Sequence, residues 1–127
     1  MIINFEDQTT ELTPEEVSLI PVLLRGLRTK GPGNPVKAPE IVSGMNKYIE
    51  RAGGRLRFTD SRLRKMVNYI RSHGIEAVIA TSKGYYVSRD PAEIIAQVRS
   101  LEQRARAIEA CAEAMRGLMQ KIIAAPM

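Results

Sequence analysis

Hydrophobic residues recur at intervals of three and four positions in three stretches of the first 73 residues, and this period predicts three amphipathic helices. The first helix begins after Thr13, which precedes a proline at the first helical position and a glutamate, Glu16, at the third. It is expected to end near Leu27. Pro21 lies inside it and should kink it or locally break its hydrogen bonds, because proline has no backbone N–H.

A glycine- and proline-rich loop, residues 28–39, leads to a second helix that begins at Pro39 and ends at Gly53-Gly54. The third helix begins at Thr59 or Asp60 and stops at Gly74. At 100° per residue, one side of it carries an apolar stripe made of Leu63, Met66, Val67 and Ile70. The opposite side and its flanks carry polar and cationic residues, which are Ser61, Arg62, Arg64, Lys65, Asn68 and Arg71. The third helix therefore has a core side and a cationic side.

Two short β-prone runs follow, residues 77–81 and residues 85–87. The three residues between them, 82–84, predict a hairpin in which Gly84 takes the left-handed conformation of a bulge and Lys83 lies at the tip. Tyr85 and Tyr86 alternate faces, so one is expected to pack on the core while the other could face a bound partner.

The longest predicted helix begins at Asp90, where Pro91 and Glu93 repeat the capping arrangement of the first helix, and runs to about Ala124. Its apolar residues are spaced alternately four and three apart, which is a heptad seam over four repeats. The seam residues are Ile94, Val98, Leu101, Ala105, Ile108, Ala112, Met115, Met119 and Ile122.

A helix of this length extends ~50 Å, which is more than a small domain covers, so part of the seam should meet a second chain. We therefore expect a homodimer, whose strand direction the pattern leaves open. In a parallel pair Arg104 would face Glu109 of the other copy. Gly117 and the alanines weaken the seam. The alternative is that the first two turns pack back on their own domain.

These elements predict a mainly α protein with a small β-hairpin (α+β): an acidic segment over 1–12, one domain over 13–89, and a long helix over 90–127 for dimerisation. Charge divides along the same lines. Residues 1–24 carry five acids and no base, whereas residues 25–89 carry fourteen Lys and Arg against four acids. Basic charge concentrated in this way is typical of proteins that bind a polyphosphate.

Three helices followed by a hairpin, with the third helix basic on its outer side, is the element order of a winged helix-turn-helix. In that geometry the third helix enters the major groove of duplex DNA and the hairpin, or wing, lies along the neighbouring backbone. Arginine and asparagine can pair with guanine and adenine edges, so the polar side of the third helix predicts base contacts. The residues better placed for phosphate are Arg55, Arg57 and Lys83.

The segment TDSRLRKMVNYIRSHGIEAVIATSKGYYVSRDPAEI, followed by RSLEQRARAIE, resembles the winged-helix domains encoded by many bacteriophages and prophages, and more distantly the N-terminal winged helix of the biotin repressor. The resemblance covers roughly residues 13–115 and implies a DNA-binding regulator of transcription or a factor in phage replication. The connection AGGRLRFT is longer than the usual turn of about three or four residues. By the resemblance the recognition-helix positions are Arg62, Arg64, Lys65 and Asn68, and the wing tip is Lys83.

Other function classes have less support. Asp60 and Asp90 are explained as helix caps, and no paired carboxylates or nucleophile with its base indicate an enzyme such as a nuclease. One cysteine, Cys111, and one histidine, His73, are too few for a zinc site or a disulfide, and no cofactor or small-molecule substrate is expected. No membrane-spanning run or secretion signal is evident, which favours the cytoplasm. The remaining alternative is an adaptor that binds protein through a winged helix and a coiled coil.

Overall fold

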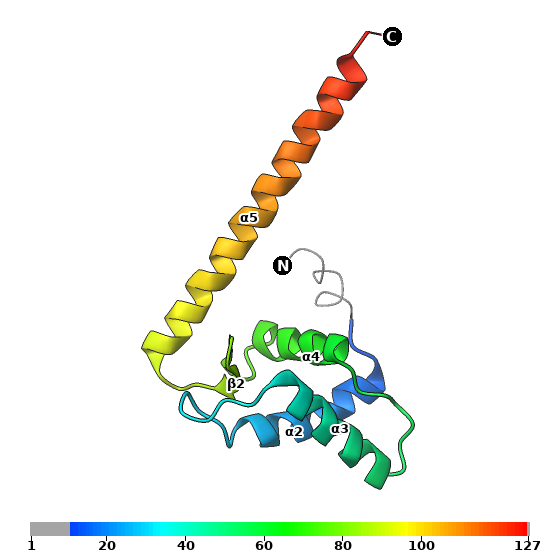
Figure 1. The fold of residues 1–127 in the computed structure, drawn as a ribbon, viewed down its shortest axis with the longest axis vertical. Coiled ribbons are helices and arrows are strands. Elements are labelled where there is room, and N and C mark those ends of the chain that lie inside the picture. The colour runs from blue at the N-terminus through cyan, green and yellow to red at the C-terminus, as the bar shows by residue number, and fades with distance from the viewer. Residues whose placement is uncertain (1–10, 127) are drawn as a thin grey trace.

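The computed structural model describes residues 11–126, so most of the predicted acidic segment lies outside the described residues. Within these residues, three helices and a two-stranded hairpin form an N-terminal domain, and one long helix follows it (Figure 1). In chain order these elements are α2 (Pro14–Leu27), α3 (Ala38–Arg51), α4 (Asp60–Ser72), β1 (Val78–Thr81), β2 (Gly84–Val87) and α5 (Pro91–Ala124). The predicted fold class, mainly α with a small hairpin and a long C-terminal helix, is confirmed.

The start of α2 is fixed by a capping box. The Thr13 backbone N–H donates to Glu16 Oε1 at 2.9 Å, and the Glu16 N–H donates to Thr13 Oγ1 at 3.2 Å. Pro21 lies inside this helix and does not end it, because α2 continues through it to Leu27. Pro21 removes one donor, and the carbonyl that loses its partner belongs to Val17, a residue that is 44% exposed.

The core lies between α2, α3 and α4, with β1 and the residue Val36 closing one side. The side chain of Phe58, in the connection between α3 and α4, is 1% exposed and fills the space between these helices. The apolar stripe predicted for the third helix forms the centre of the core, and its members, Leu63, Met66, Val67 and Ile70, are 0–3% exposed. Burial of this stripe holds α4 against α2 and α3.

The hairpin is tighter than predicted, because Thr81 pairs with Gly84 and only Ser82 and Lys83 connect the strands. Gly84 has a positive φ of 136°, but its role differs from that of a bulge residue. A Cβ on Gly84 would lie 2.5 Å from the Val36 carbonyl oxygen. The reason is a bridge between Val36 and Tyr85, in which each backbone N–H donates to the other's carbonyl, at 2.9 and 2.8 Å. This bridge ties the loop before α3 to β2.

The helix α5 leaves the domain at an angle and extends far beyond it (Figure 1). Asp90 caps it as predicted, since its side chain accepts a hydrogen bond from the Ala92 N–H at 3.0 Å. None of the described residues of α5 is fully buried. No helix within residues 11–126 has both the length and the hydropathy needed to cross a bilayer.

Candidate nucleic-acid interface

The candidate interface is centred on α4, whose first turn is fixed by Thr59. The Thr59 side chain accepts a hydrogen bond from the Arg62 N–H at 3.2 Å, so Thr59 rather than Asp60 is the cap. Gly74, with φ of 63°, ends the helix in the left-handed conformation that glycine tolerates. The predicted contact residues in this helix are all half-buried rather than fully exposed, and they are Ser61, Arg62, Arg64, Lys65, Asn68 and Arg71.

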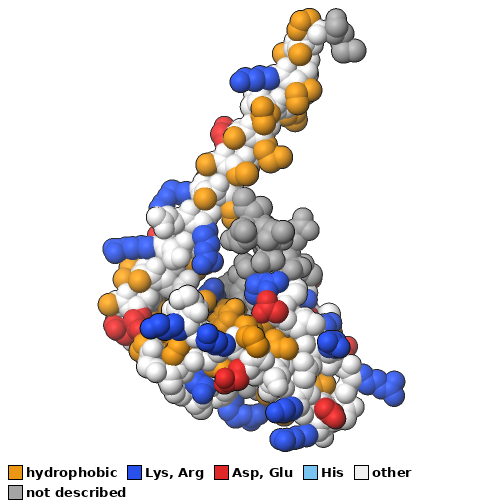
Figure 2. Space-filling view, in the orientation of Figure 1, with side chains coloured by type: hydrophobic (Ala, Val, Ile, Leu, Met, Phe, Trp, Pro, Cys, Tyr) orange, Lys and Arg blue, Asp and Glu red, His pale blue; other side chains and the backbone are white. Residues whose placement is uncertain are grey.

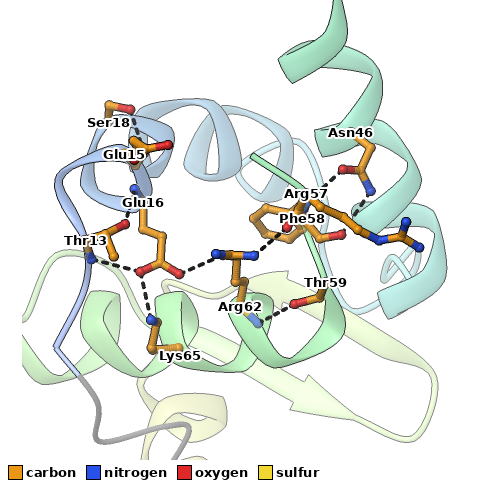
Figure 3. A network of polar contacts seen from close by, with 10 residues as sticks. All are labelled: Thr13, Glu15, Glu16, Ser18, Asn46, Arg57, Phe58, Thr59, Arg62 and Lys65. Atoms are coloured by element: carbon orange, nitrogen blue, oxygen red, sulfur yellow. Dashed lines mark hydrogen bonds and ion pairs between the residues drawn. The ribbon is translucent and has the colours of Figure 1, made fainter. Parts of the chain in front are cut away.

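Two of these cations pair with a buried carboxylate from α2 (Figure 3). The Glu16 side chain is 1% exposed; its Oε1 lies 2.8 Å from Lys65 Nζ and its Oε2 lies 3.1 Å from Arg62 Nε. Arg62 Nη1 also donates to the Arg57 carbonyl oxygen at 2.6 Å. One carboxylate from the first turn of α2 therefore joins α2, α4 and the connection that precedes α4.

Burial of Glu16 would by itself raise its pKa, because the charged form loses hydration. The hydrogen bond from Lys65, the bonds from Thr13 and the Lys65 charge outweigh that effect and hold the pKa of Glu16 below its ordinary value of 4.5. Glu16 is therefore ionised at neutral pH, and it orients Arg62 and Lys65 along α4. This arrangement gives both cations a structural role, and base contact by either of them stays a prediction.

Arg64 and Asn68 lie one turn apart on α4. Arg64 pairs with Asp60 four residues earlier in the same helix, and its side chain is 22% exposed. Asn68 is half-buried. Both side chains therefore have interactions within the protein, and contact with a base edge would require them to exchange these partners.

Arg71 turns away from this surface toward β1. Its Nε donates to the Val78 carbonyl oxygen at 2.9 Å, and within the described residues its buried Nη2 has no hydrogen-bond partner. Burial, with a smaller effect of the Arg104 charge, lowers the pKa of Arg71, although a guanidinium remains charged. In the structure Arg71 thus holds α4 to the hairpin, and its contact with a base stays a prediction.

The three residues predicted to contact phosphate are exposed, as the prediction requires. Arg55 and Arg57 lie in the connection before α4, and Lys83 lies at the hairpin tip. Figure 3 shows the Arg57 side chain directed away from the Glu16 network. This long connection is fastened by Asn46 of α3, whose Oδ1 accepts from the Phe58 N–H at 2.8 Å and whose Nδ2 donates to the Phe58 carbonyl at 3.0 Å. The position of Arg57 is therefore defined by α3 as well as by α4.

Both tyrosines of β2 pack within the protein. Tyr86 is 6% exposed, and its hydroxyl donates to Glu93 Oε2 at 2.9 Å. Tyr85 is half-buried near Asp60 and Arg71, and burial raises the pKa of each tyrosine. Glu93 also accepts from the Ser88 hydroxyl at 2.6 Å, so it joins the hairpin to α5 instead of completing a capping box.

A groove of about 550 Å³ separates the hairpin from the first turns of α5. Its walls include Arg71, Ile75 and Ile79 on the domain side and Ile94, Val98 and Leu101 on α5. The Ala80 N–H donates across it to Gln97 Oε1 at 3.2 Å. The first turns of the predicted dimerisation seam thus face their own domain across a groove, while the rest of the seam projects into solvent.

The structure places the seam residues along one helix and fully buries none of them. Ile94 and Ile108 are half-buried, and Ala105 and Ala112 are exposed. The other large residues of the seam have exposed fractions of 39% for Val98, 38% for Leu101, 65% for Met115, 51% for Met119 and 74% for Ile122. Figure 2 shows hydrophobic side chains along the upper half of α5, whereas Lys and Arg are spread over the N-terminal domain.

Sequence reasoning missed Glu16, Asn46 and Gln97 as residues that position the site. Glu16 was identified only as a capping residue, and its neighbours Glu15 and Val17 give no sign of its burial. Asn46 could have been found from the sequence, because it lies closer to the apolar face of its helix, beside the buried Met45, than the other polar residues of that helix do. Each of the three acts on a residue more than ten positions away along the chain.

The described residues include no group of three or more His, Cys, Asp or Glu that could hold a metal ion. Cys111 is exposed on α5, and His73 stacks on Tyr69 with the ring centroids 3.9 Å apart. Comparison of the chain with protein-family models, curated proteins and solved structures gives no match.

Proposed function

We propose that the chain is a cytoplasmic protein that binds duplex DNA through a winged helix-turn-helix. In this proposal α4 lies in the major groove and the β1–β2 hairpin is the wing against the adjacent backbone. Residues 25–89 hold fourteen Lys and Arg against four acids, and this concentration of charge is the observation that carries the proposal. Regulation of transcription and phage replication are the two uses implied by the resemblance described above.

The position of the exposed cations supports this orientation. Arg55 and Arg57 are exposed in the connection that leads into α4, and Lys83 is exposed at the tip of the hairpin that follows α4 along the chain. Lys37, at the cap of α3, is also exposed and follows Val36, which is bonded to the hairpin. Phosphates on either side of the major groove would meet these side chains while α4 lies between them.

The contacts of Glu16 support a division of roles within α4. Lys65 and Arg62 hold the helix through Glu16, so we assign them to orientation of α4 and not to base contact. Arg64 and Asn68, one turn apart, are then the residues assigned to base edges. Arg55, Arg57 and Lys83 are assigned to phosphate. Ser61, at the start of α4, has a hydroxyl that can donate to phosphate.

Salt-titrated binding to duplex DNA tests the proposal. If about six cations contact phosphate, log affinity should fall against log salt with a slope near −5. Arg64→Ala or Asn68→Ala should lose about 1–3 kcal/mol on the preferred sequence and flatten the preference there. Lys83→Ala should weaken all sequences alike. A slope near zero, or no binding at low salt, would exclude DNA binding.

A protein-binding adaptor is the second candidate function, and one observation favours it specifically. Two cations of α4 are already neutralised in part by Glu16, while α5 exposes a long apolar seam. An adaptor of this kind would bind its partner with little dependence on salt, because apolar contact is insensitive to screening. The same titration therefore separates the two candidates.

A further inference from the structure

The C-terminal half of α5 carries more exposed apolar surface than its heptad seam requires. Leu118 and Ile123 flank the seam on its two sides and are 58% and 75% exposed. Together with Met115, Met119 and Ile122 they form a broad apolar end of the helix. Contiguous apolar surface of this kind marks a contact surface in soluble proteins.

The groove between the hairpin and α5 offers apolar walls at the opposite end of the same seam. Ile75 is 39% exposed on its domain side, and Val98 and Leu101 line its helix side. Arg71 also lines it and contributes a positive charge to its wall. A helix C-terminus would suit this groove, because its last carbonyl groups lack partners and carry partial negative charge.

The groove also restricts how two α5 helices can pair. The Gln97 side chain contacts β1, so the seam near Val98 already has the hairpin on one flank. A parallel partner would bring its own domain to this same end, where the hairpin wall stands. An antiparallel partner brings only the end of its α5, while its domain lies at the far end of the pair.

Side-chain sizes along the seam match in one antiparallel register, centred on Ala110. In it every small residue faces a large one: Ala105 lies opposite Met115, and Ala112 lies opposite Ile108. A parallel pair would instead place each alanine against itself and leave two thin layers. In the antiparallel register Val98 and Leu101, at the groove, lie opposite Ile122 and Met119 of the second copy.

Flanking residues are compatible with this register. Flanking positions of an antiparallel pair are displaced by one residue from the core layers, so Ile95 lies beside Ile123 of the second copy and Glu102 lies beside Arg116, each pair occurring twice by symmetry. Glu109 meets itself at the centre, which is a like-charge contact in solvent and costs little. The parallel alternative has the Arg104 and Glu109 pair in its favour, so charge pairing favours neither direction clearly. Side-chain sizes along the seam and the position of the groove favour the antiparallel direction.

We propose that two copies of the chain pair through antiparallel α5 helices, with the C-terminal turns of each helix in the groove of the other copy. This inference does not depend on DNA binding. It has a consequence for a DNA site, because the first residues of the two helices would lie about 57 Å apart at 1.5 Å per residue. Half-sites would then be separated by more than the ~34 Å of one turn.

Spin-label distances test the helix direction. In a Cys111→Ser background, labels at Lys121→Cys should lie about 33 Å apart along the axis, since residue 121 is eleven positions from the centre. A parallel pair would bring them within about two helix diameters, roughly 20 Å. Labels at Ala110→Cys serve as the matched control, because both directions give about 20 Å there. A short distance at 121 would overturn the antiparallel arrangement.

Sedimentation of charge-swapped variants tests the register. Glu102→Arg should weaken the dimer about tenfold, and Arg116→Glu added to it should restore the affinity. The matched control combines Arg104→Glu with Glu109→Arg, a pair that is coupled only in the parallel dimer. Coupling in the control and not in the first pair would overturn the proposal, as would a wild-type monomer at tens of micromolar.

Ile75→Glu tests the groove, because it adds a charge to the groove wall without touching α5. It should weaken the dimer by about tenfold or more, while Val17→Glu, an equally exposed apolar residue on α2, should leave the dimer unchanged. Circular dichroism verifies that both variants are folded. Equal dimer affinity for Ile75→Glu and wild type would show that the groove is not occupied by the second copy.

Discussion

Replacement of Glu16 by glutamine removes one negative charge from the network that joins α2 to α4. The amide can still accept the Thr13 N–H, so the capping bond at 2.9 Å is preserved while Lys65 and Arg62 lose their carboxylate. Removal of one partner from a fully buried ion pair costs about 3–5 kcal/mol. Here the Lys65 and Arg62 side chains are 13% and 35% exposed and recover some hydration, so we expect a loss of about 2–3 kcal/mol.

Urea unfolding followed by circular dichroism measures this loss. With a typical slope of about 1.5 kcal/mol per molar, the midpoint should fall by roughly 1–2 M with the slope unchanged. All variants are compared at one protein concentration, because the proposed dimer would add to the apparent stability. Glu15→Gln is the matched control, since Glu15 is the adjacent, exposed residue of the same helix turn, and it should change stability by less than about 0.5 kcal/mol.

The pH dependence provides a second measurement on the same pair of proteins. Because the pKa of Glu16 is lowered on folding, its carboxylate contributes stability above the unfolded value of 4.5 and loses that contribution as pH falls through the folded pKa. The difference between wild type and Glu16→Gln should therefore be constant above about pH 5.5 and shrink below pH 4.5. A loss below 0.5 kcal/mol at pH 7, or a difference that grows on acidification, would refute the structural role of Glu16.

Three further predictions concern single residues. Gly84→Ala should destabilise the domain by about 1–3 kcal/mol in the same urea assay, because its Cβ would lie 2.5 Å from the Val36 carbonyl, whereas Gly33→Ala, with nothing within 4 Å, should be nearly neutral. Asn46→Ala should lower the free energy of unfolding by about 1–3 kcal/mol, because two hydrogen bonds to Phe58 are lost. An unchanged stability would show that the connection between α3 and α4 does not depend on Asn46. On duplex DNA, Arg57→Ala should reduce the slope of log affinity against log salt by about one unit. Lys65→Met should leave this slope nearly unchanged and should lower the free energy of unfolding. The reverse pattern would show that Lys65, and not Arg57, contacts phosphate.

Much of the fold could be predicted because its signals are local. Thr13 and Asp90 begin helices through hydrogen bonds to backbone groups within three residues, and Gly74 ends a helix through its own φ. The core stripe of α4 follows from helical period alone. These features depend on neighbours in sequence, so their pattern is sufficient evidence.

What sequence reasoning missed depends on contacts between distant segments. The Val36 bridge to Tyr85 joins a proline-flanked loop to β2, and this bridge requires glycine at position 84 in addition to the positive φ of that residue. Pro21 was expected to kink α2 or locally break its hydrogen bonds, and α2 nevertheless continues to Leu27, because the burial of Leu23, Leu24 and Leu27 stabilises the helix beyond the proline. At both positions, contacts between distant segments determine the structure in addition to the local preferences of glycine and proline.

The cationic side of α4 shows why a basic helix face is not by itself evidence of a nucleic-acid interface. Helical period places Arg62, Lys65 and Arg71 opposite or beside the apolar stripe, but it cannot show that Glu16 and the Val78 carbonyl lie within reach of them. Once these contacts are counted, the network of Glu16 with two cations keeps one net positive charge. It therefore still favours phosphate nearby while it fixes the angle of α4 against α2. A DNA-binding helix needs both properties, since the base contacts proposed for Arg64 and Asn68 would depend on that angle. The stability assay on Glu16 and the binding assay on Arg57 therefore test separate parts of the proposed interface.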